Sequence, residues 1–187
     1  MTNYPISTRT QLPDEFQTLL KDYPREAWEK HPDMAPFTQN WLEAHAMFRR
    51  LDKIIVKDTQ KFLDKSRSGE DFAKRIGFYG GQLVDNLTRH HHFEDEQFFP
   101  TISSVTPDFD RGLEMLESDH EALTKAMEDF VISGNSAIDL AVQDDTQAID
   151  AAGKVLEKAQ ALQDFLARHL ADEEDLVVPI LLHHKMR

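Results

Sequence analysis

The chain of 187 residues contains no cysteine. This absence excludes a disulfide framework, thiolate zinc sites, iron–sulfur clusters and a cysteine nucleophile. Glycine and proline are also scarce, with 7 and 8 residues, and β-branched runs bounded by turn residues are missing, so strands are not expected. The longest apolar run, residues 176–182, contains Pro179 and is far shorter than the roughly 20 residues that span a bilayer.

Basic residues are few beside the acidic ones, with 21 Lys and Arg against 34 Asp and Glu and a net charge of −13. A surface this negative repels phosphate backbones and anionic lipids, so neither nucleic acid nor a membrane is an expected partner. The N-terminal residues contain no apolar signal core, and a cytoplasmic location is expected. Hydrophobic residues make up 40% of the chain, which is typical of a packed domain.

Long segments rich in Ala, Leu, Glu, Lys and Gln predict an all-α fold. Four long helices are expected over residues 38–64, 70–102, 108–133 and 144–183, with a shorter helix over 13–21 and a helical turn at 25–31. Loops of roughly 4–10 residues suit an up-down-up-down four-helix bundle. We therefore divide the chain into a short N-terminal helical extension, residues 1–36, and a bundle, residues 37–187.

Individual residues mark the expected helix ends and contacts. Thr38 is the expected N-cap of the first long helix, and Asp144 or Asp145 that of the fourth. Gly134 is expected to end the third helix. Within the second helix, glycines at residues 77, 80 and 81 either weaken the helix or mark the close approach of a neighbour.

Apolar residues recur at helical spacing, which predicts one core-facing stripe on each long helix. Each stripe is interrupted by polar residues at positions where an apolar residue is expected. The interruptions are His45 in the first helix, His90 and Glu94 in the second, His120 in the third, and His169 and Glu173 in the fourth. A lone histidine on an apolar face is more often a hydrogen-bonded core residue than a ligand. One histidine from each of four helices, together with two carboxylates that are costly to bury unpaired, predicts a bound cation.

The four histidines can meet only if they lie at one depth in the bundle. Counted from the shared end of the four helices, their positions differ by roughly 10 Å at 1.5 Å per residue. They are therefore expected to form one layer. His31, His183 and His184 do not fit this layer and are expected at the surface.

The second helix offers three pairs at i,i+4 spacing, and spacing alone does not choose among them. The pairs are His90/Glu94, His91/Asp95 and His92/Glu96. The first pair is favoured because it continues the stripe of residues 72, 76, 79 and 83. An internal repeat also favours it, since aligning Arg89 with Arg168 matches His90 with His169. His91 is the reserve candidate in this helix, and Glu174 is the reserve for Glu173.

The predicted ligands are imidazole nitrogens and carboxylate oxygens, without sulfur. Imidazole suits zinc, copper, iron and nickel, whereas carboxylates favour harder ions such as manganese and iron. Six protein ligands exceed one tetrahedral zinc site. They suit two metal ions, each bound by two histidines, with both glutamates bridging. An oxo or hydroxo bridge would add a fifth ligand to each ion and leave a position open.

This pattern resembles the hemerythrin-like family, whose members are often called HHE cation-binding domains. The residues that carry the resemblance are His45, the run from His90 to Glu94, His120, and His169 with Glu173, and the similarity covers residues 37–184. The resemblance implies a four-helix bundle that holds two iron ions with an oxo or hydroxo bridge, for which zinc or manganese are possible substitutes.

The oxygen-carrying members have a fifth histidine one turn after the ligand of the third helix, where this chain has Thr124. Thr124 is expected to face the metal layer. Without the fifth histidine the two ions would be more alike in their ligands, which argues against a simple oxygen carrier. The resemblance implies a centre that binds or reacts with dioxygen, nitric oxide or peroxide in a monomer or homodimer. Iron storage, iron handling, sensing and a purely structural metal site are the alternatives, and whether the chain is an enzyme stays open.

Overall fold

The computed structural model describes residues 4–186, with only the backbone for residue 145. These residues form helices and no strands, so the predicted all-α fold is confirmed. The chain folds into two compact units. The first contains the chain up to Ala46, His91–His120 and the chain from Phe165 onward, and the second contains Met47–His90 and Glu121–Asp164.

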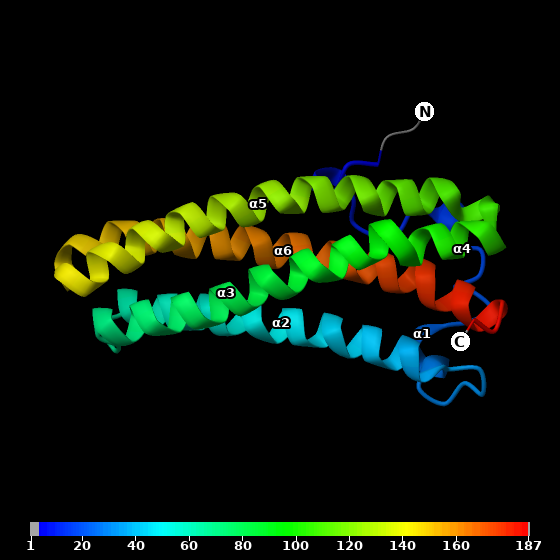
Figure 1. Ribbon diagram of the computed structural model, residues 1–187, viewed down its shortest axis with the longest axis horizontal. Coiled ribbons are helices and arrows are strands. Elements are labelled where there is room, and N and C mark those ends of the chain that lie inside the picture. The colour runs from blue at the N-terminus through cyan, green and yellow to red at the C-terminus, as the bar shows by residue number, and fades with distance from the viewer. Residues whose placement is uncertain (1–3, 187) are drawn as a thin grey trace. The chain divides into compact units, whose positions relative to one another are not determined.

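Four long helices dominate the fold, and each contributes residues to both units (Figure 1). They are α2 (Pro36–Leu63), α3 (Gly69–Phe93), α5 (Asp110–Gln143) and α6 (Asp145–His183). The short elements are η1 (Ile6–Thr8), η2 (Asp14–Phe16), α1 (Arg25–Trp28), the π-helical segment η3 (Glu94–Phe98), α4 (Phe99–Val105) and η4 (Pro107–Phe109). None of the helices in the described part of the chain has the length and apolarity needed to cross a membrane.

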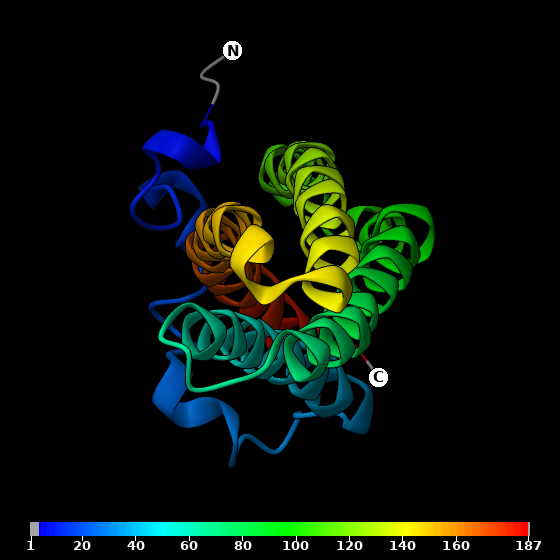
Figure 2. The same cartoon turned by 90° about the vertical axis from the view of Figure 1, so that its left-hand side faces the viewer.

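In the second unit all four long helices contribute buried apolar side chains, such as Phe48, Phe72, Leu123 and Val155. Figure 2 views the helices from the side of the turns that join α2 to α3 and α5 to α6. Phe62 of α2 stacks on Phe72 of α3 with ring centroids 4.5 Å apart. Helices α3 and α5 meet at Gly80, where an added Cβ would lie 3.3 Å from the ring of Phe130. The close approach expected from the glycines is therefore found at Gly80, whereas Gly81 faces open space.

Several helix ends differ from the expectation. Helix α5 continues past Gly134 to Gln143, so the predicted helix end at Gly134 is wrong, and no described glycine adopts the left-handed backbone that ends a helix. Thr38 lies inside the first turn of α2, which begins at Pro36, so its prediction as an N-cap is wrong. Asp144 does cap α6, since its Oδ1 accepts a hydrogen bond of 2.8 Å from the amide of Thr146.

The helix predicted over residues 70–102 is interrupted, and the one predicted over residues 13–21 is shorter than expected. Residues 70–102 do not form one α-helix, because the π-helical segment η3 separates α3 from α4. The helix expected over 13–21 is reduced to the single turn η2, and the turn expected at 25–31 is α1. The N-terminal residues are nevertheless folded, since Leu12, Phe16 and Trp28 are buried.

The first unit has its own apolar core, to which the N-terminal segment, α2, η3, α4, α5 and α6 all contribute. Its buried members are Leu12, Phe16, Trp28, Trp41, Phe98, Phe99, Ile102, Leu113, Met115, Leu116, Leu176, Val177, Val178, Ile180, Leu181 and Leu182. Helices α5 and α6 approach closely at Gly112, where an added Cβ would lie 2.9 Å from Leu176. Trp41 and Phe99 of this core lie against histidines of the polar cluster described below.

A buried carboxylate in the second unit gives a testable consequence. Asp52 accepts a hydrogen bond of 2.6 Å from Gln163, but its Oδ1 is buried and has no hydrogen-bond partner. Burial raises the pKa of Asp52 from 3.8 to about 6, partly offset by that hydrogen bond. The folded state therefore holds the proton more tightly than the unfolded state, and the contribution of Asp52 to stability falls as the pH rises from about 4 to above 6.

We expect Asp52→Asn to raise the melting temperature by about 3 °C or more at pH 8 and to have little effect near pH 4. The reason is that asparagine keeps a partner for Gln163 without a buried charge. Asp58 is the matched control, because Arg67 and Arg75 bind its carboxylate and Asp58→Asn should lower the melting temperature at pH 8. Thermal unfolding followed by circular dichroism measures both. A gain for Asp52→Asn that is the same at pH 4 and pH 8 contradicts the assignment.

Candidate metal centre

A cluster of buried histidines and carboxylates lies inside the first unit. Its members are His45 of α2, His91 of α3, Glu94 of η3, Asp119 and His120 of α5, and Asp172, His169, Glu173 and Glu174 of α6. The sequence folds this way because His45, His120 and His169 continue the apolar stripes of their helices. The polar groups are therefore carried into the interior by the burial of their apolar neighbours.

Three histidines form one half of the cluster. His91, His120 and His169 are buried, and each offers a ring nitrogen within 4.8 Å of the others. The rings of His91 and His120 stack with centroids 4.1 Å apart, and the ring of His169 stands edge-on to that of His120 at 4.9 Å. Three converging imidazoles of this kind can hold one metal ion.

The carboxylates lie between the histidines. His45, Glu94 and Glu173 offer ligand atoms within 4.8 Å of one another. Oε2 of Glu173 is 3.5 Å from Nε2 of His45 and 3.7 Å from Nε2 of His169. Oε2 of Glu94 is 3.8 Å from Nε2 of His120. Glu173 therefore stands between histidines of two helices, which is the place of a carboxylate that bridges two ions.

The protein alone leaves this cluster incompletely satisfied. Both carboxylate oxygens of Glu173 and Nε2 of His169 are buried and make no hydrogen bond within the described residues. Burial and the neighbouring Glu94 raise the pKa of Glu173 well above its ordinary value. Burial lowers the pKa of His169 despite a hydrogen bond to Asp119, which favours the neutral imidazole. Buried imidazole nitrogens and carboxylates that lack positive partners fit a metal cation.

The second ring nitrogen of three histidines meets a further carboxylate. These contacts join His45 Nδ1 to Glu174 Oε1 at 3.0 Å, His120 Nδ1 to Asp95 Oδ1 at 2.7 Å, and His169 Nδ1 to Asp119 Oδ2 at 3.4 Å. A carboxylate at Nδ1 holds the proton there and leaves Nε2 as the lone-pair donor. In each of the three rings it is Nε2 that faces the interior carboxylates.

Trp41 is a member of the cluster that the sequence analysis missed. Its Nε1 donates a hydrogen bond of 2.6 Å to Oε1 of Glu94, and its ring lies 4.1 Å from that of His45. Trp41 precedes His45 by one helical turn on the same stripe, so its contact with the cluster could have been predicted from spacing. It fixes one oxygen of Glu94 and leaves the other to face His120.

The π-helical segment η3 begins at Glu94, whose carbonyl accepts the amide of Phe99. Such a turn contains one residue more than an α-helical turn and is often found at functional sites. It shifts the register after Glu94, so that Phe98 and Phe99 are both buried and Asp95 reaches His120. No sequence pattern considered above indicates this turn.

Five of the six predicted ligands come together in the first unit: His45, Glu94, His120, His169 and Glu173. The sixth, His90, is the last residue of the second unit and is half-buried, with its ring 5.0 Å from that of Phe48. It lies next to His91 and one turn before Glu94 along the same stretch of helix, so its role as a ligand stays a prediction.

The reserve candidates behave differently from one another. His91 joins His120 and His169, because the buried stripe of α3 runs through Leu83 and Leu87 to His91. Glu174 is buried, and it contacts Nδ1 of His45, the ring nitrogen that faces away from Glu173. It therefore orients His45 rather than joining the predicted ligands.

Other polar residues lie outside the cluster. The side chain of Thr124 is exposed, so the expectation that it faces the metal layer is wrong. His183 and His184 are exposed, as expected, whereas His31 is half-buried.

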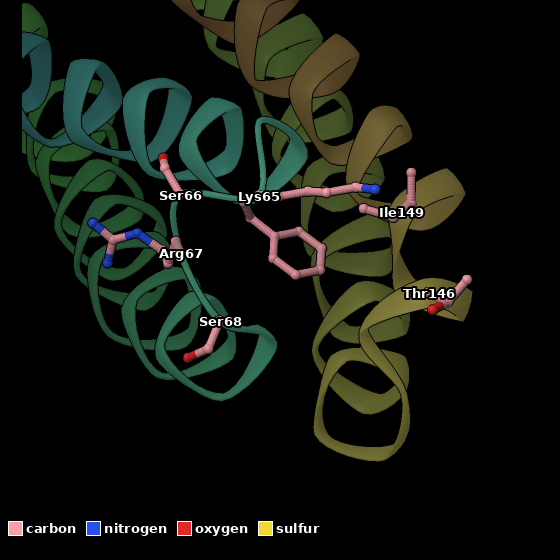
Figure 3. Close-up of a pocket in the computed structure, with 7 residues that line it drawn as sticks. Lys65, Ser66, Arg67, Ser68, Thr146 and Ile149 are labelled. Carbon is pink, nitrogen blue, oxygen red and sulfur yellow. The ribbon is translucent and has the colours of Figure 1, made fainter.

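A separate pocket of about 590 Å³ in the second unit is a weaker candidate (Figure 3). Its lining consists of Phe62, Lys65, Ser66, Arg67, Ser68, Thr146 and Ile149. Lys65 extends toward Ile149, whereas Arg67 turns away and is bound by Asp58 and Asp71. Among the described lining residues there is no histidine or carboxylate, so this pocket offers nothing to hold a metal ion.

The comparisons with known proteins agree with this geometry. A family model described as Hemerythrin HHE cation binding domain matches residues 37–181. The matched range includes every predicted ligand and His91. Neither a search of curated proteins nor a search of solved structures finds a match.

The histidine trio makes a prediction that separates two neighbouring residues. We expect His91→Ala to weaken metal binding by at least about tenfold, since even residues that only support ligands contribute 10–100-fold. His92→Ala should leave binding unchanged, because His92 is exposed and pairs with Glu96 at 3.0 Å. Metal content after dialysis and competition with a chromogenic chelator measure both variants. Loss of metal from His92→Ala alone would mean that the helix register is wrong.

Replacement of Glu173 by glutamine should stabilise the metal-free protein but reduce the stabilisation that metal binding provides. Glu173→Gln removes a buried carboxyl that is crowded by Glu94, so we expect a higher melting temperature without metal. The same change removes a charged ligand, so metal should raise the melting temperature less than in the parent. Glu157→Gln, on an exposed position of α6, is the matched control. A Glu173→Gln protein that is less stable in both states contradicts this assignment.

Proposed function

Since the chain belongs to the hemerythrin HHE cation-binding family, we propose that its buried cluster holds two iron ions that bind or react with dioxygen, nitric oxide or peroxide. The observation that carries this proposal is the position of Glu173 between His45 and His169, with both carboxylate oxygens lacking a hydrogen-bond partner within the described residues. A single ion would leave one of the two flanking histidines without a metal.

The donor set supports two unequal ions. One ion would be held by His91, His120 and His169, and the other by His45 and by His90, which precedes Glu94 by one turn. Glu94 and Glu173 would bridge them. Nitrogen and oxygen donors without sulfur suit iron, with manganese and zinc as substitutes. His91 would thus supply the additional imidazole that Thr124 does not, so threonine at residue 124 does not speak against reversible oxygen binding.

When bound, iron supplies one-electron redox chemistry and a coordination position for a small ligand. The chain supplies orientation and exclusion of water. Asp95, Asp119 and Glu174 hold the Nδ1 protons of three histidines, and Trp41 holds one oxygen of Glu94. Trp41 and Phe99 of the apolar core pack against His45 and His120, and both histidines are buried from solvent.

The size and polarity of a nearby pocket support a small ligand. This pocket of about 250 Å³ in the first unit is lined by Phe37, Phe93, Gln97, Phe98, Thr101, Leu181 and Met186. The ring of Phe98 packs 6.0 Å from that of Trp41, which in turn binds Glu94. An uncharged diatomic molecule partitions into such a lining more readily than a charged metabolite does.

The test is reconstitution with iron under anaerobic conditions. We expect about two irons per chain and, after exposure to oxygen, visible absorption that zinc-loaded protein lacks. Stopped-flow mixing of the reduced protein with dioxygen, nitric oxide or peroxide should change this spectrum within one turnover. Glu173→Ala is the control, since it should remove both the iron and the spectral change.

The alternatives predict other results. Many irons per chain would indicate storage. Two irons that stabilise the fold but react with none of the three ligands would indicate a structural site and would contradict the proposal.

A further inference from the structure

The N-terminal segment, residues 4–35, lies outside the matched family range but within the first unit. It contributes Leu12, Phe16 and Trp28 to the core of that unit. It also carries two arginines, Arg9 and Arg25, and each of them reaches carboxylates of the metal cluster. No feature of the sequence assigned a role to either residue.

Arg9 is almost completely buried, with 3% of its side chain exposed. Its Nε donates to Oδ2 of Asp172 at 2.6 Å, and its Nη2 donates to Oδ2 of Asp119. Its Nη1 donates to the carbonyl of Tyr4 at 2.7 Å. Asp119 is the residue whose Oδ2 lies 3.4 Å from Nδ1 of His169. The guanidinium of Arg9 therefore stands directly behind the carboxylate that orients a predicted ligand.

Arg25 repeats this arrangement at another histidine. Its Nη1 donates to Oε2 of Glu174 at 2.7 Å and its Nε to Oδ1 of Asp175 at 2.6 Å. The other oxygen of Glu174, Oε1, lies 3.0 Å from Nδ1 of His45. Glu174 is thus held from both sides, by a guanidinium from the N-terminal segment and by an imidazole from α2.

We propose that the N-terminal segment is a positioning element of the metal centre, in which Arg9 and Arg25 act through Asp119 and Glu174 on His169 and His45. The inference rests on the proposed metal site. A carboxylate clamped by a guanidinium is fixed in direction and is a weaker base, so it holds the imidazole ring without removing its Nδ1 proton. Both histidines then present Nε2 to the metal in one fixed orientation.

The anchoring of the segment by itself does not require these contacts. The segment is already held by its buried apolar residues and by an exposed pair between Arg111 and Glu15, at 3.1 and 3.2 Å. Burial of a guanidinium with two carboxylates is a poor source of stability compared with apolar packing. A role in anchoring the segment does not explain why each of the two arginines lies behind a different predicted metal ligand.

The experiment compares Arg9→Gln and Arg25→Gln with Arg111→Gln as the matched control, in full-length protein loaded with zinc or with iron. We expect Arg9→Gln to release metal to excess chelator about 10–100-fold faster than the parent. Arg25→Gln should be less affected, because 42% of the Arg25 side chain is exposed. Arg111→Gln should match the parent. The visible spectrum of the iron form should shift for Arg9→Gln and not for Arg111→Gln.

A second comparison separates positioning from loss of stability. If Arg9 acts through Asp119, the double variant Arg9→Gln/Asp119→Asn should release metal no faster than Asp119→Asn alone. Arg9→Lys keeps the positive charge but loses the planar guanidinium that binds two carboxylates. Compared with Arg9→Gln, it should therefore recover more of the thermal stability than of the metal retention. Arg25→Gln serves as an independent test if Arg9→Gln does not fold.

The outcomes distinguish this inference from the proposed function. Parent-like metal release and spectra in Arg9→Gln and Arg25→Gln, in protein that binds two irons, overturn the positioning role and leave the proposed centre intact. Additive effects of Arg9→Gln and Asp119→Asn overturn the route through Asp119. A parent protein that binds neither zinc nor iron overturns both proposals.

Discussion

Two carboxylates, Glu94 and Glu173, are fully buried against each other inside the first unit, and the arrangement around them follows from the need to compensate their charge. Carboxylates in an apolar interior are stable only when they are protonated, paired or bound to a cation. No cationic side chain of the described residues pairs with Glu173, and the groups that face it are the imidazoles of His45 and His169. Metal cations bound by both glutamates and by those imidazoles would compensate this charge.

Around this pair the first unit is built in layers. Imidazoles face the glutamates, further carboxylates face the outer nitrogens of the imidazoles, and guanidinium groups of the N-terminal segment face those carboxylates. Acidic and basic groups therefore alternate from the centre outward. Each layer fixes the direction of the one inside it, so a ring at the centre is held by contacts that begin in another part of the chain. The apolar core encloses the inner layers and excludes the water that would otherwise compete for them.

The sequence predicted the features that follow from helical periodicity. The all-α fold and the burial of His45, His120 and His169 depend only on which positions share a face, so they could be read directly. The participation of His91 could not be decided, because three adjacent histidines cover most of a helical turn. The π-helical turn at Glu94 and the contacts of Arg9 depend on tertiary packing, which periodicity does not encode. Glycine at residue 134 predicted a helix end, but its conformation was overridden by the continuing stripe of α5.

The central claim is the proposal that one iron ion is held by the histidine trio and a second by His45 and His90, with Glu94 and Glu173 shared between them. A crystal structure of the iron-loaded protein, with anomalous data collected on both sides of the iron absorption edge, tests it most directly. The account predicts two iron peaks about 3.5–4 Å apart. Glu173 should reach both peaks, and His91 should be bound to the same ion as His120 and His169. A single peak, or iron bound only by exposed residues such as His183, would contradict it.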